Sequence, residues 1–157
     1  MKKTVATFFG VGWFPVMPGT IASVIAVPIA LLFHGLGGFP VLVAATLGLF
    51  LIGWWSVSDG AENDPAEFVI DEIAGQCISI WPYSAWLWVR EESLSTNHWP
   101  IVAGSLALFR LFDIWKPGPI GAIDERHDAL GIMLDDALAG VAAAVLLAAA
   151  LFLLELK

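Results

Sequence analysis

Three aspartates stand inside otherwise apolar sequence. Asp71 lies within residues 68–75, and Asp135 and Asp136 lie within residues 132–140. A carboxylate that enters an apolar environment costs several kcal/mol, so such a residue usually has a partner and a task. A helix dipole supplies only about 0.3–1 kcal/mol, which is too little to stabilise these charges. We therefore expect the three aspartates to serve chemistry.

The two segments share the pattern Asp-x-x-Ala-Gly, which ends at Gly75 and at Gly140. A spacing of four places the carboxylate and the glycine on one helix face. Glycine there lets two helices approach until carboxylates from both can reach one cation. Oxygen ligands without a Cys or His cluster favour Mg²⁺ over Zn²⁺. Ion pairing with Arg110 or Lys116 is the structural alternative.

Arg110, Asp113 and Lys116 recur at every third residue before Pro117. If helical, they share a face that presents two cations around one carboxylate, and the proline ends the helix. Two cations beside a metal suit a phosphate ester, because phosphoryl transfer requires charge neutralisation. A lysine that only extends to the membrane interface would give the same pattern for Lys116 alone.

A helix start is predicted near residues 15–23, with Thr20 as the cap and Ser23 in the first turn. Free backbone N–H groups at such a start could hold a phosphate, although ordinary capping explains the pattern equally well.

These residues must be positioned by membrane helices. Apolar residues make up 59 % of the 157-residue chain, more than the ~45–50 % of soluble domains, and one small core cannot hide them from water. No charged residue occurs between Lys3 and Asp59, a stretch much longer than the ~20 residues of one membrane helix. The glycines and proline of residues 34–40 predict a reversal between residues 21–33 and 41–57.

Three further charge-free runs cover residues 73–89, 93–109 and 137–154. We therefore expect one domain over residues 1–157, an all-α membrane bundle of four to five membrane segments. The first segment is short and contains Pro28, which suggests a broken or re-entrant helix.

Placing Lys2 and Lys3 in the cytoplasm puts the loops 58–72 and 110–136 on the same side. Five of the seven bases and 12 of the 15 acids then lie on that side, in agreement with the positive-inside rule. The net charge of −8 and the lack of a further basic cluster exclude a nucleic-acid partner. A lone cysteine, Cys77, excludes a disulfide framework and is expected to be buried.

The motifs together resemble the bacterial phosphatidylglycerophosphatase A family. The resemblance covers about residues 8–145, in the order and spacing of the family. Ala22 stands where a glycine is expected, and residues 128–130 replace a more glycine-rich stretch. The motifs are Met-Pro-Gly-Thr-Ile-Ala-Ser at 17–23, Asp-Pro at 64–65, Val-Ile-Asp-Glu-Ile-Ala-Gly at 69–75, Phe-Arg-Leu-Phe-Asp-Ile-Trp-Lys-Pro-Gly-Pro at 109–119, Leu-Gly-Ile-Met-Leu-Asp-Asp at 130–136 and Ala-Gly at 139–140.

The resemblance implies an Mg²⁺-dependent phosphatase of the bacterial inner membrane that converts phosphatidylglycerophosphate to phosphatidylglycerol and phosphate. Its active site would face the cytoplasm. The expected metal ligands are Asp71, Glu72, Asp135 and Asp136. Asp113 or Glu72 would act as a ligand or as the base that activates water. The phosphate would be bound by Arg110, Lys116, Thr20 and Ser23.

Two other classes compete with this interpretation. A membrane cation transporter or channel could use interfacial carboxylates, but transport favours acids at mid-membrane, whereas these flank the apolar runs. A structural membrane subunit would leave the paired carboxylates without a task. The sequence leaves the oligomeric state open.

Overall fold

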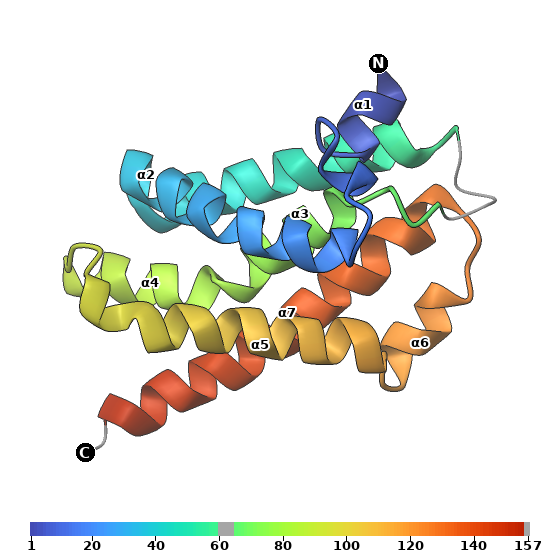
Figure 1. The fold of residues 1–157 in the computed structure, drawn as a ribbon. Coiled ribbons are helices and arrows are strands. Elements are labelled where there is room, and N and C mark those ends of the chain that lie inside the picture. Colours follow the sequence, from blue (N-terminus) through green and yellow to red (C-terminus); the bar gives the residue numbers. More distant parts are fainter. Residues whose placement is uncertain (60–64, 156–157) are drawn as a thin grey trace.

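The computed structural model describes residues 1–59 and 65–155, and every regular element within them is a helix (Figure 1). This confirms the predicted all-α class. Residues Glu62, Asp64 and Lys157, which entered the charge counts and motifs, lie outside the described residues. In chain order the elements are α1 (Lys2–Ala6), η1 (Val11–Trp13), α2 (Pro18–Val57), α3 (Ile70–Ser79), α4 (Trp81–Arg90), η3 (Thr96–His98), α5 (Trp99–Trp115), α6 (Pro119–Asp124) and α7 (Ala129–Glu155).

The 40 residues of α2 form two arms that reverse at Gly37 and Gly38, which confirms the predicted turn (Figure 1). Gly38 has a φ of +70°, and a Cβ there would lie 1.9 Å from the ring of Trp88 in α4. Only glycine meets both demands. The first arm passes through Pro28 without a non-helical residue, so the break lies at the glycines and not at this proline.

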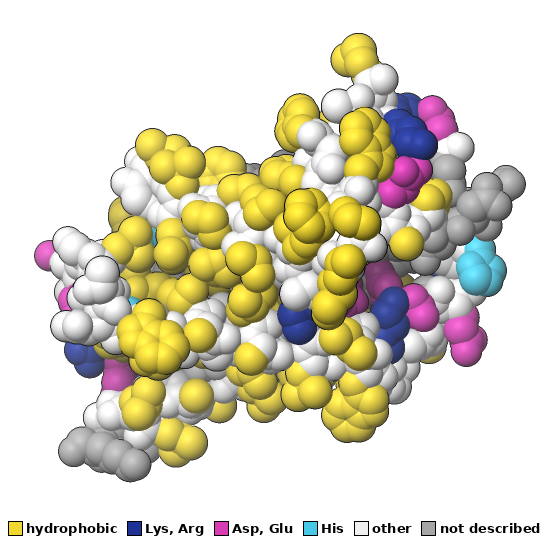
Figure 2. All heavy atoms as spheres, in the orientation of Figure 1, with side chains coloured by type: hydrophobic (Ala, Val, Ile, Leu, Met, Phe, Trp, Pro, Cys, Tyr) yellow, Lys and Arg dark blue, Asp and Glu magenta, His cyan; other side chains and the backbone are white. Residues whose placement is uncertain are grey.

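Two of the described helices, α2 and α7, are long and apolar enough to cross a membrane. The runs at 73–89 and 93–109 appear instead as α3 and α4, of 10 residues each, and α5, of 17 residues. The number of four to five membrane segments therefore stays a prediction. Hydrophobic side chains cover the middle of the face in Figure 2, and charged side chains gather towards the two ends.

Helices α3 and α7 touch backbone to backbone where they cross. A Cβ on Gly75 would lie 2.6 Å from the carbonyl oxygen of Asp136, and one on Gly140 would lie 2.3 Å from the carbonyl oxygen of Gly75. The close approach predicted from the two Asp-x-x-Ala-Gly segments is thus confirmed.

A shared core surrounds α3, with buried Ile73, Cys77 and Ile80 packed among residues of α2 and α7. The burial of Cys77 agrees with the prediction. The first turn of α3 emerges from this core at the end of the bundle where α1 and α6 lie (Figure 1). The carboxylates of that turn are therefore attached to a helix whose other residues are buried.

Ion pairs mark the two ends of the bundle. Lys2 bonds to Asp59 at 2.7 Å and Lys3 to Glu67 at 2.8 Å, which joins α1 to the segments that follow α2. At the other end Arg90 bonds to Glu155 at 3.0 Å. The segments predicted to share one membrane side thus lie together at one end of the bundle.

Candidate active site

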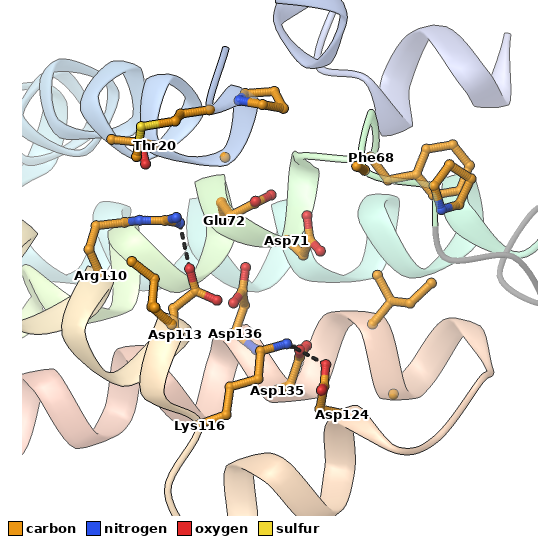
Figure 3. Close-up of a pocket in the computed structure, with 18 of the residues that line it drawn as sticks. Thr20, Phe68, Asp71, Glu72, Arg110, Asp113, Lys116, Asp124, Asp135 and Asp136 are labelled. Carbon is orange, nitrogen blue, oxygen red and sulfur yellow. Dashed lines mark hydrogen bonds and ion pairs between the residues drawn. The ribbon is translucent and has the colours of Figure 1, made fainter. Parts of the chain in front are cut away.

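A cavity of about 490 Å³ opens at the end of the bundle near α6, and residues from α2, α3, α5, α6 and α7 line it (Figure 3). It collects every predicted site residue except Ser23. The predicted residues that line it are Thr20, Asp71, Glu72, Arg110, Asp113, Lys116, Asp135 and Asp136.

Asp71, Glu72 and Asp136 form a carboxylate triad at the centre of the cavity. One oxygen from each lies within 4.8 Å of the others, and Figure 3 shows the three groups turned toward one another. Asp71 and Glu72 belong to the first turn of α3, and Asp136 belongs to α7, so the glycine crossing brings them together.

The triad has the properties of a site for a hard cation. Asp71 Oδ1 and Glu72 Oε2 are buried and have no hydrogen-bond partner among the described residues. Three anionic groups this close repel one another unless a cation or a proton intervenes. Gly19 of α2 covers Glu72 so closely that a Cβ would lie 2.0 Å from Glu72 Oε1. The chemistry of these donors fits Mg²⁺.

Asp135 lies outside this triad. Its Oδ2 accepts a hydrogen bond from Lys116 Nζ at 2.7 Å, and its Oδ1 accepts one from the backbone N–H of Asp136 at 2.9 Å. Successive helix residues point about 100° apart, and here Asp135 faces Lys116 whereas Asp136 faces Asp71 and Glu72. For Asp135 the ion-pairing alternative describes the structure, and its role as a metal ligand stays a prediction.

The predicted helical face with two cations around Asp113 is also wrong. Arg110 does pair with Asp113 at 2.5 Å, one helical turn away. Lys116, however, ends α5 with a φ of +45°, so its side chain leaves the helical register and pairs with Asp124 and Asp135. The helix stops before Pro117 because a proline disfavours helical geometry at the preceding residue.

Lys116 is held as a cation by its two acidic partners. Burial alone would lower the pKa of its ammonium group, but the hydrogen bonds to Asp124 and Asp135 outweigh burial and raise the pKa above its ordinary value. The lysine therefore carries a full positive charge at neutral pH, beside a cavity that is otherwise rich in acids.

The start of α2 lies two residues before the predicted cap. The helix begins at Pro18, preceded by Met17 with a φ of +50°, because proline is already shaped for the first helical position. Thr20 is therefore inside the first turn, and its buried Oγ1 has no partner in the described part of the chain. The predicted capping role of Thr20 is wrong.

Ser23 is fully buried behind this turn and does not line the cavity. Its hydroxyl donates to the Gly19 carbonyl at 2.8 Å and accepts a long contact of 3.5 Å from Arg110 Nη1. It can support Arg110 but cannot touch a ligand in the cavity. Ala22, which departs from the family pattern, is also fully buried and away from the cavity lining.

Sequence reasoning did not single out Asp124, Arg126 or Gly19, which also line the cavity. Asp124 ends the six-residue helix α6 and binds Lys116. A signal existed for Asp124, since the Pro-Gly-Pro turn after Lys116 reverses the chain and returns the next acids toward the lysine. Gly19 belongs to the motif at 17–23 but was not predicted to line the site, and nothing in the local sequence marks Arg126 as part of one.

Comparisons with known proteins found relatives that match almost the whole chain. The family model described as phosphatidylglycerophosphatase A matches residues 4–151. A phosphatidylglycerophosphatase A of Escherichia coli is 33 % identical over 147 residues, covering 90 % of this chain and 78 % of that protein. One from Haemophilus influenzae is 30 % identical, covering 89 % of this chain and 82 % of that protein.

A protein of Bacteroides thetaiotaomicron named a putative phosphatidylinositol-3-phosphatase is 30 % identical over 156 residues, covering 93 % of this chain and 91 % of that protein. The comparison with solved structures gave no match. All three relatives carry names of phosphatases that act on phosphorylated lipids.

Proposed function

The chain belongs to the phosphatidylglycerophosphatase A family, and from this premise we propose that it hydrolyses phosphatidylglycerophosphate to phosphatidylglycerol and inorganic phosphate with Mg²⁺ at the carboxylate triad. Membership makes the chain a phosphoric monoester hydrolase that acts on lipid phosphates in phospholipid synthesis. The observation that carries the finer proposal is the meeting of the carboxylate triad with Arg110 and Lys116 in one cavity.

The donor set of the cavity supports the choice of metal. Asp71, Glu72 and Asp136 would hold the ion through oxygen atoms, two of which lack any other partner in the described chain. When bound, Mg²⁺ supplies charge neutralisation and Lewis-acid polarisation of a phosphoryl oxygen. Each carboxylate sits on a packed helix, so the ligands are held in place before the cation arrives.

The phosphate would be oriented by cations on two sides of the triad. Arg110 reaches the cavity from α5, close to Gly19 and Thr20 of α2, and Lys116 lies on the opposite side near Asp135 (Figure 3). The negative charge on the phosphoryl oxygens redistributes as the ester bond breaks, and both side chains would stabilise it in the transition state. The Thr20 hydroxyl and the amide groups of the first turn of α2 add neutral donors.

Asp113 is the best-placed general base. Its carboxylate lies between Arg110 and Asp136, and the pair with Arg110 at 2.5 Å fixes its orientation (Figure 3). It would accept a proton from the water whose oxygen bonds to phosphorus as the ester P–O bond breaks. Protonation of the departing oxygen, by this carboxyl group or by solvent, then gives the lipid alcohol and phosphate. Glu72 would then act as a ligand of the cation and not as the base.

We further propose a multi-pass position in the bacterial inner membrane with the cavity toward the cytoplasm. The cavity lies at the bundle end that holds Lys2, Lys3 and Arg126. Cytoplasmic segments of membrane proteins are enriched in such bases.

The test is phosphate release by the purified protein in detergent micelles, with Mg²⁺ and again with EDTA. Phosphatidylglycerophosphate is the first substrate, and phosphatidylinositol 3-phosphate is the comparison because one relative carries that name. We expect Mg²⁺-dependent release from phosphatidylglycerophosphate and none with EDTA. Release that persists at full rate in EDTA would contradict the proposed role of Mg²⁺ in the reaction. A folded protein that releases no phosphate would support cation transport instead.

A further inference from the structure

An apolar groove runs along the face of the bundle between the first arm of α2 and α5. Its volume is about 660 Å³, within the range of small-molecule sites. Figure 2 shows hydrophobic side chains over this region of the surface. Residues that line the groove include Val24, Pro28, Leu31, Trp99, Val102 and Leu106, and no acidic or basic residue lines it.

The groove continues the candidate active site along the same two helices. On α2 the last cavity residue is Thr20, and the first groove residue is Val24, one turn later. On α5 the order is reversed, with Leu106 in the groove one turn before Arg110 in the cavity. Residues four apart share a helix face, so the polar cavity and the apolar groove form one continuous surface.

The distance from the phosphate site to the far end of the groove matches one leaflet of a membrane. Eleven residues separate Arg110 from Trp99, and at a rise of 1.5 Å per residue this is about 16 Å. Half of a hydrocarbon core of about 30 Å is about 15 Å. A chain that starts at the phosphate site and follows the groove would therefore reach about the middle of the bilayer.

We propose that this groove holds one acyl chain of the lipid whose phosphate binds in the cavity. The inference rests on the proposed function and adds to it a binding site for the lipid tail. A single occupant explains both halves of the surface, because a phospholipid joins an anionic phosphate to a hydrocarbon chain within a few bonds. A second copy of this protein would cover the groove but would leave its connection to the phosphate site without a purpose.

The kinetic test replaces Ala103, an exposed residue of α5 that lines the groove, with tryptophan, whose side chain would occupy the groove. Ala44 is its matched control, because it is exposed on the second arm of α2 and lines neither the groove nor the cavity. We expect Ala103→Trp to raise KM about tenfold or more for long-chain phosphatidylglycerophosphate, since displacing two methylene groups from an apolar site suffices for this change. For a short-chain analogue Ala103→Trp should match wild type, and Ala44→Trp should match it for both lipids.

The binding test needs no variant and no turnover. A phosphatidic acid with a diazirine in the middle of one acyl chain is photolysed with the wild-type protein in micelles, and the labelled peptides are identified by mass spectrometry. We expect label in peptides that contain residues 24–31 and 99–106, reduced in Ala103→Trp and unchanged in Ala44→Trp.

The two tests separate failure of the groove from failure of the function. Label spread evenly over the exposed apolar surface, or equal KM values for both tryptophan variants with both lipids, would overturn the acyl site. Cross-linked peptides from two protein chains at this face, without lipid label, would assign the groove to a second copy instead. If the lipid probe labels the groove of a protein that releases no phosphate, the acyl site is supported and the proposed reaction is contradicted.

Discussion

At the scale of single residues, neighbouring carboxylates have different tasks. Asp136 joins Asp71 and Glu72 around one point, whereas Asp135 neutralises Lys116. Both aspartates are buried, so exposure does not distinguish them. The two aspartates differ in their partners: Asp135 pairs with Lys116 at the end of α5, and Asp136 lies beside Asp71 and Glu72 of α3.

Replacing Asp136 by asparagine should lower turnover about 100-fold or more, because a carboxylate–cation interaction is worth several kcal/mol and each 1.4 kcal/mol is a factor of ten. The change keeps the shape of the side chain, so the protein should still fold. The measurement is phosphate release as a function of Mg²⁺ concentration, and we expect the variant to require more Mg²⁺ for half-maximal rate.

Two controls accompany this variant. Asp135→Asn should leave the Mg²⁺ requirement unchanged, because Asp135 faces Lys116 and not the triad. Asp59→Asn, which removes a pair with Lys2 outside the cavity, should leave rate and Mg²⁺ requirement unchanged. An Asp136→Asn enzyme with wild-type Mg²⁺ dependence would contradict the proposed triad.

The positions of Arg110 and Ser23 predict unequal effects for two residues expected to bind phosphate. Arg110→Met should reduce kcat/KM by about 100-fold or more, because it removes a charge that faces the reacting phosphate. Ser23→Ala should cost less than about tenfold, since the serine touches only Gly19 and, weakly at 3.5 Å, Arg110. The measurement is kcat/KM on micellar substrate for both variants. Equal losses of kcat/KM would indicate that Ser23 contacts the ligand.

At the scale of elements, the site depends on how closely α3 and α7 cross. The carbonyl oxygen of Asp136 lies against Gly75, so Asp136 belongs to both the crossing and the triad. Other glycines lie in open helix surface: a Cβ on Gly48 in α2 would meet nothing within 4 Å. The two positions therefore separate the effect of helix propensity from the effect of packing.

We expect Gly75→Ala to destabilise the protein by about 1–3 kcal/mol, as overpacking in a core does. The new Cβ would lie 2.6 Å from both the Asp136 carbonyl and the Phe109 ring. Gly48→Ala should be neutral or stabilising by up to about 1 kcal/mol, because alanine favours a helix over glycine. Thermal unfolding in detergent measures both, and a Gly75→Ala protein as stable as Gly48→Ala would refute the tight crossing.

At the scale of the whole molecule, charge is divided between the two ends of an apolar bundle. One end carries the cavity, the N-terminal lysines and α6, and the other carries Arg90 and Glu155. Hydrophobic side chains cover much of the face between the ends that Figure 2 shows. A membrane around this middle zone would expose the two ends to opposite compartments.

Single cysteines test this orientation. Glu125→Cys lies at the cavity end and Glu92→Cys at the other, and both positions are exposed. A membrane-impermeant maleimide should label Glu92→Cys in intact spheroplasts but Glu125→Cys only after lysis. The unchanged protein is the control, because Cys77 is buried and should not react. Labelling of Glu125→Cys in intact spheroplasts would reverse the proposed orientation.

The sequence by itself determined the helical class, the reversal at residues 34–40 and eight of the residues that line the cavity. These inferences depend on local properties: the length of charge-free runs, the need for glycine and proline at a turn, and the cost of a carboxylate in apolar sequence. The Asp-x-x-Ala-Gly spacing even predicted the close contact of two helices, because a four-residue spacing places both groups on one face.

Only the tertiary structure decided how the charges are paired. Asp135 and Asp136 look equivalent in sequence, but α5 and α6 bring Lys116 and Asp124 to one of them, and α3 brings Asp71 and Glu72 to the other. The left-handed backbone at Lys116 redirected that lysine away from Asp113, and the first turn of α2 placed Thr20 in the cavity and Ser23 behind it. Charge pairing depends on distances between segments far apart in the chain, and local pattern does not contain those distances.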